Sequence, residues 1–374
     1  MRKKGLSPFV PVLKTLRRMR VLITGICGFA GSTLARSLLK HREGLSLAGI
    51  DNLSRAGSET NLDPLRSLGC RIQVADLRDP RVLEEHPPAD WLIDAAANPS
   101  VLAGLSASSS SRELMDTNLV STLPMLEFCR RHRATFTLLS TSRVYGIRPL
   151  REIPLAVRSG AFHPVSTAPD LAHGIPESFP TTPPLSLYGA SKLCSETLAL
   201  EYGEAFEFPV WINRCGVLAG AGQFGRADQG IFSYWIHRWA ARQPLRYLGF
   251  GGLGHQVRDC LHPRELTPLL LRQWDAGRSG SAASRPPAIL NVSGGAPSAT
   301  SLCELSAWCA EKVGPHPVES DPSERPFDLP WVVLDSALAR SVWNWYPSQS
   351  RAELFEEIAA HALRHPLWWQ QCGG

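Results

Sequence analysis

The 374-residue sequence predicts an α/β fold, a doubly wound parallel sheet followed by a smaller mixed domain. Two observations lead to this fold class. Short apolar runs rich in β-branched residues alternate with longer amphipathic segments up to about residue 214, as in strand–helix–strand units. Three spaced glycines also follow the first apolar run directly, at the point where such a unit turns from strand into helix.

Six strands are expected in the first part of the chain, because each is a short apolar run. The runs cover 20–24, 45–51, 71–75, 91–96, 134–140 and 209–214. Helical periodicity is found between runs, at 32–41, 112–133 and 187–205. Right-handed crossovers then place the ligand crevice of a doubly wound sheet at the carboxyl ends of its strands.

The chain is expected to divide into a large and a small domain. We assign residues 19–214 to a cofactor-binding domain, which contains a proline-dotted loop at 147–186, and residues 215–374 to a substrate-binding domain. Residues 1–18 carry six basic side chains and no acidic one, so the formal charge of +5 becomes −1 for the rest of the chain. We expect this segment to be a disordered basic extension, with Met19 as a natural start.

The composition excludes several classes of protein. Hydrophobic residues make up 44% and charged residues 20% of the chain, as in a soluble globular protein. No apolar run approaches the roughly 20 residues that span a bilayer. The nine scattered cysteines form no CxxC pair, which argues against a zinc site and for reduced thiols. We therefore expect a cytoplasmic protein with no metal and no membrane or nucleic-acid partner.

The glycine turn predicts a dinucleotide site. Gly25, Gly28 and Gly31 would allow a tight turn and a close approach of the backbone to a pyrophosphate at the helix N-terminus. Asp51 ends the next apolar run, where a carboxylate binds a ribose diol. Because that carboxylate repels a 2′-phosphate, NAD is favoured over NADP, although the nearby Arg55 leaves NADP open. The sheet is therefore predicted to be of the Rossmann type.

A tyrosine and a lysine form the second candidate site. Tyr188 and Lys192 lie four residues apart on the helix expected at 187–205, and hence on one face of it. A phenol is a poor base at neutral pH, but a nearby ammonium favours the phenolate. The alternative is an amphipathic helix with a lysine that extends to the solvent. The glycine turn and the hydroxyl residues at 140–142 favour a catalytic role.

In these motifs the chain resembles the extended short-chain dehydrogenase/reductase family. TGICGFAGS, DNLS, AAANPS, STSRVYG and YGASK occur in that family's order. The resemblance implies that Tyr188 is the catalytic base, that Lys192 assists it, and that Thr141 hydrogen-bonds the reacting substrate oxygen. Asp94 stands where the family commonly has histidine, a change that we interpret as bearing on packing more than on chemistry.

The resemblance also implies a tightly bound NAD that is regenerated in each turnover. The expected cofactor contacts are Gly25, Gly28, Phe29, Ala30, Gly31, Asp51, Asn52, Ser54, Arg55, Asp76, Leu77, Ala95, Ala96, Ala97, Pro99, Asn118, Tyr188 and Lys192.

Three further stretches suggest the substrate. HQVRDCLHP at 255–263 is similar to the family segment whose arginine, here Arg258, binds the diphosphate of a nucleotide sugar. IDNLSRAGSETNLDPLR at 50–66 and AGQFGRADQGIFSYW at 221–235 resemble the CDP-paratose 2-epimerases, also called CDP-tyvelose 2-epimerases. The expected substrate contacts are Ser142, Arg143, Gln223, Gln229, Gly230, Gln256 and Arg258.

The implied reaction oxidises the sugar transiently at C2 and returns the hydride to the opposite face. Alternatives are a 4-epimerase of another nucleotide sugar and a non-catalytic NAD-binding scaffold or RNA-associated relative. A 4,6-dehydratase needs Asp-Glu after the threonine, where this chain has Ser142 and Arg143. Many relatives also carry an asparagine where Gly216 or Val217 stands, so a backbone group would have to replace that contact. The family suggests a homodimer or homotetramer.

Overall fold

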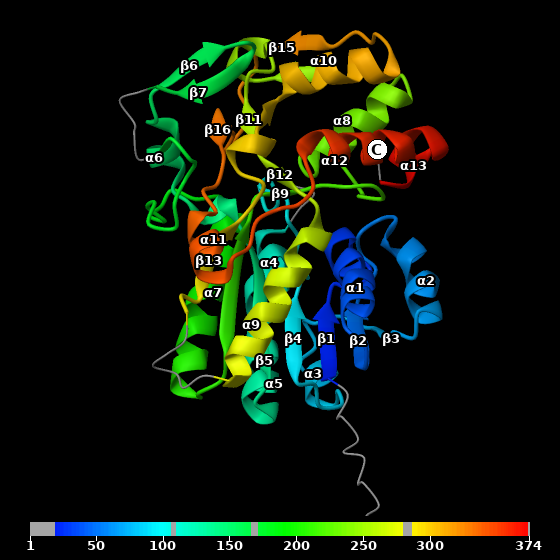
Figure 1. Cartoon of the computed structure of the whole chain (residues 1–374), viewed down its shortest axis with the longest axis vertical. Helices are drawn as coiled ribbons and strands as arrows, with labels where there is room; N and C mark the ends of the chain where they lie inside the picture. Colours follow the sequence, from blue (N-terminus) through cyan, green and yellow to red (C-terminus); the bar gives the residue numbers. More distant parts are fainter. Residues whose placement is uncertain (1–18, 106–109, 166–170, 280–285, 373–374) are drawn as a thin grey trace, which may run out of the picture.

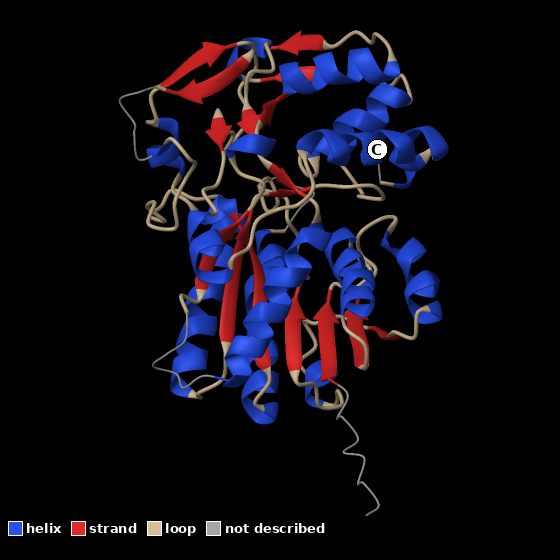
Figure 2. Cartoon of the chain, viewed as in Figure 1, coloured by secondary structure: helices blue, strands red, loops and turns tan. Residues whose placement is uncertain are grey.

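The computed structural model describes residues 19–105, 110–165, 171–279 and 286–372, in two stacked halves. Figure 1 shows the large sheet with β1, β2, β4 and β5 in the lower half, and α8, α10 and α12 in the upper half. Figure 2 shows that helices flank the strands of the large sheet on both sides. The α/β fold with a doubly wound sheet is confirmed. The basic extension predicted at residues 1–18 lies outside the described residues.

The large sheet has seven parallel strands in the order β13-β8-β5-β4-β1-β2-β3. Its strands are β1 (Met19–Thr24), β2 (Leu45–Asp51), β3 (Arg71–Val74), β4 (Trp91–Asp94), β5 (Thr135–Thr141), β8 (Val210–Cys215) and β13 (Ile289–Val292). The first six confirm the predicted runs to within two residues at either end. The strand order reverses between β1 and β4, which is the switch point where doubly wound sheets bind ligands.

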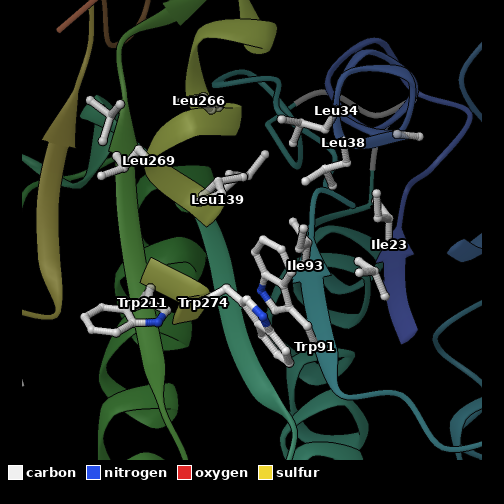
Figure 3. Packing of buried hydrophobic residues seen from close by; sticks show 14 of the residues in the cluster. Ile23, Leu34, Leu38, Trp91, Ile93, Leu139, Trp211, Leu266, Leu269 and Trp274 are labelled. Carbon is white, nitrogen blue, oxygen red and sulfur yellow. The ribbon is translucent and has the colours of Figure 1, made fainter. Parts of the chain in front are cut away.

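Alternating side chains bury both faces of this sheet. In β1, Val21 and Ile23 face one hydrophobic cluster and Leu22 faces the other. Figure 3 shows the first cluster, in which Trp91 of β4 lies beside Trp274. The two indole rings stack with centroids 5.5 Å apart. Because both faces are apolar, these strands read as short continuous runs of hydrophobic residues, which explains why the sequence predicts them well.

Helices cover the sheet on both faces. The first cluster packs against α1 (Phe29–His41), α9 (Thr267–Ser279) and α11 (Ala337–Trp343). The second packs against α3 (Arg81–Glu84), α5 (Thr122–His132) and α7 (Leu187–Ala205). A short α2 (Leu62–Ser67) precedes β3.

The helix predicted at 112–133 is interrupted. It consists of α4 (Ser111–Met115), a π-helical turn (Asp116–Val120) and α5. Pro124 cannot donate a backbone hydrogen bond to the Val120 carbonyl four residues earlier. In the turn before it, the Ser121 amide bonds the Asp116 carbonyl five residues back, and the Ser121 hydroxyl bonds the Thr117 carbonyl. The sequence prediction of one continuous helix was therefore wrong at this turn.

The smaller half contains short sheets and a group of helices. Its strands are β9 (Val217–Leu218), β10 (Arg246–Leu248), β11 (Val257–Arg258), β12 (Cys260–Leu261), β14 (Thr300–Ser301), β15 (Glu319–Asp321) and β16 (Trp331–Val332). Its helices are α8 (Ile231–Ala240), α10 (Leu302–Val313), α12 (Arg351–Arg364) and α13 (Trp368–Gln371). Aromatic side chains of α8 and α12 form much of its core.

Packing crosses the predicted division at residue 215. Both α9 and β13 come after that residue, yet they complete the large sheet and its cover. Conversely, the segment predicted as a loop at 147–186 carries α6 (Ile147–Arg151) and the antiparallel pair β6 (Leu155–Arg158) and β7 (Ala161–Pro164). Its Phe162 amide donates to the carbonyl of His255, so the segment packs on the smaller half. The domain boundary itself stays a prediction.

Candidate functional site

A cavity of about 430 Å³ lies at the carboxyl ends of the large sheet's strands, and the smaller half covers it. It brings together all of the predicted site residues except Gly31 and Asn118. The predicted residues that line it are Gly25, Gly28, Phe29, Ala30, Asp51, Asn52, Ser54, Arg55, Asp76, Leu77, Ala95, Ala96, Ala97, Pro99, Thr141, Ser142, Arg143, Tyr188, Lys192, Gln223, Gln229, Gly230, Gln256 and Arg258.

The glycine turn has the shape that a pyrophosphate requires. Gly25 has φ +65°, and a Cβ there would lie 2.8 Å from the Ala95 carbonyl oxygen. A Cβ on Gly31 would lie 2.2 Å from the Gly25 carbonyl oxygen, which explains why Gly31 supports the turn without lining the cavity. No side chain caps the helix at Gly28, so the first amides of α1 remain available to an anion.

Asp51 and Asp76, the two predicted cofactor-binding acids in the part of the cavity beside the glycine turn, have different environments. Asp51 is buried and accepts hydrogen bonds from the amides of Cys27 and Leu53, both at 2.8 Å. Burial raises the pKa of Asp51, while these bonds oppose the rise. Asp76 is more exposed, and the Arg78 guanidinium lowers its pKa to about 2. A carboxylate oxygen accepts more than one hydrogen bond, so Asp51 can still bind a ribose hydroxyl.

Arg55 is bound to the smaller half. Its guanidinium donates to the Gln229 side chain at 2.8 Å and to the Phe224 carbonyl. Burial lowers the pKa of Arg55 to about 10, with a further decrease from Arg226. Ser100 makes a second link, by donating to the Asp228 carboxylate at 2.5 Å. The predicted cofactor residue Arg55 and the predicted substrate residue Gln229 therefore contact each other across the cavity.

Asn118 does not line the cavity but supports two elements that border it. In the π-helical turn, its side-chain oxygen accepts from the Asn98 amide at 2.8 Å, and its nitrogen donates to the Asn98 carbonyl at 3.0 Å. The same nitrogen donates to the Ser191 hydroxyl of α7 at 3.3 Å. Asn118 thus joins the loop after β4 to the helix that carries Tyr188 and Lys192. π-helical turns often occur at functional sites.

The end of β5 and the start of α7 meet at the centre of the cavity. Tyr188 is 8% exposed in the first turn of α7. A Cβ on Gly189 would lie 2.2 Å from the Arg143 carbonyl oxygen, so only glycine lets the helix approach so closely. Burial raises the pKa of Tyr188 to about 12, whereas a hydrogen bond with Thr141 and the Arg143 cation lower it. Ser140 instead donates to Glu196 at 2.5 Å and supports α7.

Lys192 is almost fully buried, at 2% exposure, and its partner is Asp94. The Lys192 Nζ atom lies 3.8 Å from Oδ2 of Asp94, which is also 2% exposed. Asp94 ends β4, where Thr24 Oγ1 donates to its other oxygen at 2.7 Å. The interpretation of position 94 as a packing residue missed this contact, because the pairing of β4 with α7 is not visible in local sequence.

Three arginines line the part of the cavity that the smaller half contributes to. They are Arg143, Arg258 and Arg325, and the charges of the last two act on the first. Arg258 donates to the Asp328 carboxylate at 3.1 Å and to two backbone carbonyls. Arg143 donates to the Phe327 carbonyl at 3.1 Å, and burial together with the Arg258 charge lowers its pKa to about 9. Sequence reasoning missed Arg325 and Asp328, which lie in a loop between prolines and carry no local sign of their place in the cavity.

The structure explains why glycine stands at position 216, one of the two positions where relatives carry asparagine. A Cβ on Gly216 would lie 2.0 Å from the Ser293 hydroxyl and 2.7 Å from an oxygen of Asp259. Burial raises the pKa of Asp259 to about 6. No larger side chain fits at 216 beside these two groups.

The residues present fit a dinucleotide. The turn at Gly25 and Gly31 leaves space that any Cβ would fill. The first amides of α1 have no capping side chain and can donate hydrogen bonds to a pyrophosphate, and the Asp51 carboxylate can accept hydrogen bonds from ribose hydroxyls. Among the residues that the structure describes, no three His, Cys, Asp or Glu side chains gather as a metal site would require. In the same described ranges, no helix is both long and apolar enough to cross a membrane.

Sequence comparison also indicates a protein that binds NAD. Residues 21–285 match the family described as NAD dependent epimerase/dehydratase. The chain is similar to a CDP-paratose 2-epimerase of Salmonella typhi, with 29% identity over 67% of this chain and 73% of that protein. It is also similar to the protein CapI of Staphylococcus aureus (28%, with 58% of each chain covered). A dTDP-glucose 4,6-dehydratase of Mycobacterium tuberculosis shares 23% over 70% of each chain.

Solved structures agree on the fold. The UDP-glucuronic acid 4-epimerase of Bacillus cereus, solved with UDP-glucuronic acid and NAD, superimposes with a TM-score of 0.71 at 22% identity, covering 92% of this chain and 99% of that one. The UDP-glucose 4-epimerase of Thermus thermophilus, solved with NAD, gives a TM-score of 0.70 at 25% identity and the same coverage. The chain thus belongs to the NAD dependent epimerase/dehydratase family, and its cofactor is NAD.

Proposed function

We propose that this chain is a nucleotide-sugar 2-epimerase that interconverts CDP-paratose and CDP-tyvelose. The observation that carries the proposal is the segment at 221–235, which resembles the CDP-paratose 2-epimerases in sequence. In the structure, Gln223, Gln229 and Gly230 of this segment line the same cavity as Tyr188. The similarity to the Salmonella typhi enzyme supports the same substrate class.

The chain's own residues would bind and orient the nucleotide sugar. Arg258 and Arg325 would hold the diphosphate, since a guanidinium matches that anion in shape and charge. Asp328 holds Arg258 in place. The sugar ring would then lie between Arg143 and the hydroxyls of Thr141 and Tyr188, with the smaller half excluding water.

The proton would move at the Tyr188 oxygen. As phenolate, Tyr188 would remove the proton from the sugar 2-hydroxyl, and Thr141 would donate a hydrogen bond to the same sugar oxygen. When bound, NAD would supply the hydride acceptor for C2 and, in its reduced form, the hydride donor for the opposite face of the keto sugar. Tyr188 would finally give the proton back, so the protein ends each cycle in its starting state.

A dehydratase reaction is less well supported. Elimination of water needs an acid and a base beside the sugar, which the dehydratases of this family place directly after the threonine. Here those positions hold Ser142 and Arg143, and Arg143 is tied to the Phe327 carbonyl. A 4-epimerase would use the same Thr141, Tyr188 and Lys192 on another carbon, and a non-catalytic scaffold would need none of them.

The decisive experiment offers the purified protein three nucleotide sugars. CDP-paratose, CDP-tyvelose and UDP-glucose are incubated separately without added NAD, and each is followed by NMR. We expect interconversion of the first two, with deuterium at C2 retained in the product. Epimerisation of UDP-glucose at C4 would contradict the assignment, and turnover of none of the three would favour the scaffold.

A further inference from the structure

A segment of the smaller half, residues 223–229, borders the cavity and is bound to the large half at two places. The Arg55 guanidinium donates to the Gln229 side chain at 2.8 Å. The Ser100 hydroxyl donates to the Asp228 carboxylate at 2.5 Å. Because Arg55 follows β2 and Ser100 follows β4, the segment is joined to both of the loops that carry predicted cofactor contacts.

The ring of Phe224 packs this segment directly on the loop after β2. Phe224 lines the cavity and is 3% exposed. A Cβ on Gly57 would lie 2.6 Å from the Phe224 ring, so only glycine leaves room for the ring at this place. Arg55 also donates to the Phe224 carbonyl. The segment and the loop after β2 are therefore in close contact.

The short helix α13 packs on the same segment. The Trp368 indole stacks on the Phe224 ring, with the centroids 5.4 Å apart and 21° between the planes. Its Nε1 donates to the Gln223 carbonyl at 2.9 Å. Arg226 makes a second link, because its Nε donates to the Cys372 carbonyl at 2.7 Å. Two independent sets of contacts thus join α13 to residues 223–229.

The helix α13 also reaches the large half and is supported by α12. A Cβ on Gly57 would lie 3.3 Å from the Gln371 carbonyl oxygen. The His361 ring of α12 meets the Trp368 ring at 86°, with 4.9 Å between the centroids. The loop after β2, residues 223–229 and α13 therefore meet at one place beside the cavity.

The segment has little regular structure of its own. Arg226 and Gln229 exchange two backbone hydrogen bonds across a turn, at 2.7 and 3.0 Å. A segment that is held mainly by side-chain contacts opens locally at a lower free-energy cost than a strand or helix of the core. The closed position of residues 223–229 should therefore depend on what packs against them.

We propose that α13 is a clasp, a helix that holds residues 223–229 closed over the cofactor-binding loops and so slows the release of NAD. The proposal concerns the cofactor alone and does not depend on which sugar is the substrate. A cofactor that is regenerated in each turnover has no need to leave, and the clasp keeps it in place between turnovers.

The test measures the release of bound cofactor and needs no sugar. Protein loaded with NADH is mixed with a large excess of NAD, and the loss of the bound NADH fluorescence gives the release rate. Trp368→Ala removes the stacked ring and the indole donor, so we expect release to be about tenfold faster. Trp368→Phe keeps a ring without the donor and should give an intermediate rate. Release at the wild-type rate in Trp368→Ala would overturn the proposal.

Two further variants test the contacts of α13 separately. Arg226→Met removes the hydrogen bond to the Cys372 carbonyl from the other side of the contact, so release should also become faster, by a smaller factor. Gln370→Ala is the matched control, because this side chain is exposed on the same helix, and its release rate should equal that of the wild type. An increase in Gln370→Ala as large as that in Trp368→Ala would contradict the role of Trp368.

Hydrogen exchange distinguishes opening of the segment from a general loss of stability. In Trp368→Ala the amides of residues 223–229 should exchange faster, while those of β1 and α1 keep their wild-type protection. Faster release of NADH with unchanged exchange at 223–229 would overturn the clasp. Equal acceleration in α1 would show that the whole fold is destabilised, which also contradicts the proposal.

The sugar assay keeps the two proposals apart. If none of the three sugars is turned over while Trp368→Ala releases NADH faster as expected, the proposed function fails and the clasp stands. If the CDP-sugars are interconverted while Trp368→Ala releases NADH at the wild-type rate, only the clasp fails.

Discussion

The two ends of the cavity are built in different ways. The central part of the cofactor end comes from one continuous strand–turn–helix–strand unit, in which the glycine turn, α1 and Asp51 follow each other along the chain. The sugar end is assembled from separate segments around Arg143, Gln229, Arg258 and Arg325. Backbone geometry shapes the first end, whereas long-range side-chain contacts shape the second. A substitution should therefore act on one end without disturbing the other, except where the two ends meet.

The largest expected effect is at Tyr188, where the two ends meet. Tyr188→Phe keeps the buried ring but removes the proton-transferring oxygen, so turnover of CDP-paratose should fall by about 10² to 10⁴-fold. NAD binding, measured by calorimetry, should change little because the glycine turn is intact. Undiminished turnover in this variant would eliminate the catalytic assignment.

At the cofactor end, Gly31→Ala is expected to act through the backbone alone. Its Cβ would lie 2.2 Å from the Gly25 carbonyl oxygen, so α1 must move away from the turn. We expect NAD affinity to fall by about a hundredfold, in line with the cost of overpacking. Gly44→Ala is the control, because Gly44 lies outside the cavity lining and a Cβ there would meet nothing within 4 Å, so NAD affinity should stay the same.

At the sugar end, Arg258→Ala should raise the KM for the CDP-sugar by about tenfold, as expected for the loss of a charge-assisted hydrogen bond. NAD affinity should stay the same. Arg246→Ala is the control, since that arginine pairs with Glu319 and Asp321 on the surface outside the cavity. Equal changes in KM for the two variants would argue that general charge, and not a diphosphate contact, is responsible.

The smallest effect concerns acid stability at the cofactor end. The folded-state pKa of Asp76 is lowered to about 2 by Arg78, from an ordinary value of 3.8. The pair therefore stabilises the fold above about pH 4, and this contribution is lost as the pH falls toward 2. Because both side chains are partly exposed, Arg78→Ala should cost less than about 1 kcal/mol. Urea midpoints of the two proteins should differ at pH 6 and converge as the pH falls from about 4 toward about 2.

Local sequence predicts the cofactor end better than the sugar end for a physical reason. A buried parallel strand is a short apolar run wherever it occurs, and a turn that brings Gly25 close to Gly31 excludes any Cβ. Both features can be read within a few residues. By contrast, β13 and α9 look like any other strand and helix, and only their packing on β8 and α1 assigns them to the large sheet.

The same limit explains the misses within the site. Arg325 reaches the cavity because the loop after β15 folds back over β11, which no spacing along the chain indicates. Asp94 contacts Lys192 only because the end of β4 lies behind the first turns of α7. Neither contact has a local sequence signal. The prediction of a continuous helix at 112–133 was wrong for another reason, because a local signal was present. Pro124 indicated an interruption, and its effect on the preceding turn was not recognised.

The pairing of β13 with β8 has a consequence for anyone who dissects this protein. A fragment that stops at residue 214 would leave β8 as a bare sheet edge and would uncover the indole of Trp211, which packs at 5.3 Å from that of Trp343. Exposed edges and aromatic faces promote association between chains. We therefore expect such a fragment to aggregate, and a soluble cofactor-binding unit to need α9 and β13 grafted back onto it. A cut at residue 214, where the regular alternation of strands and helices ends in the sequence, therefore does not yield a self-contained folding unit.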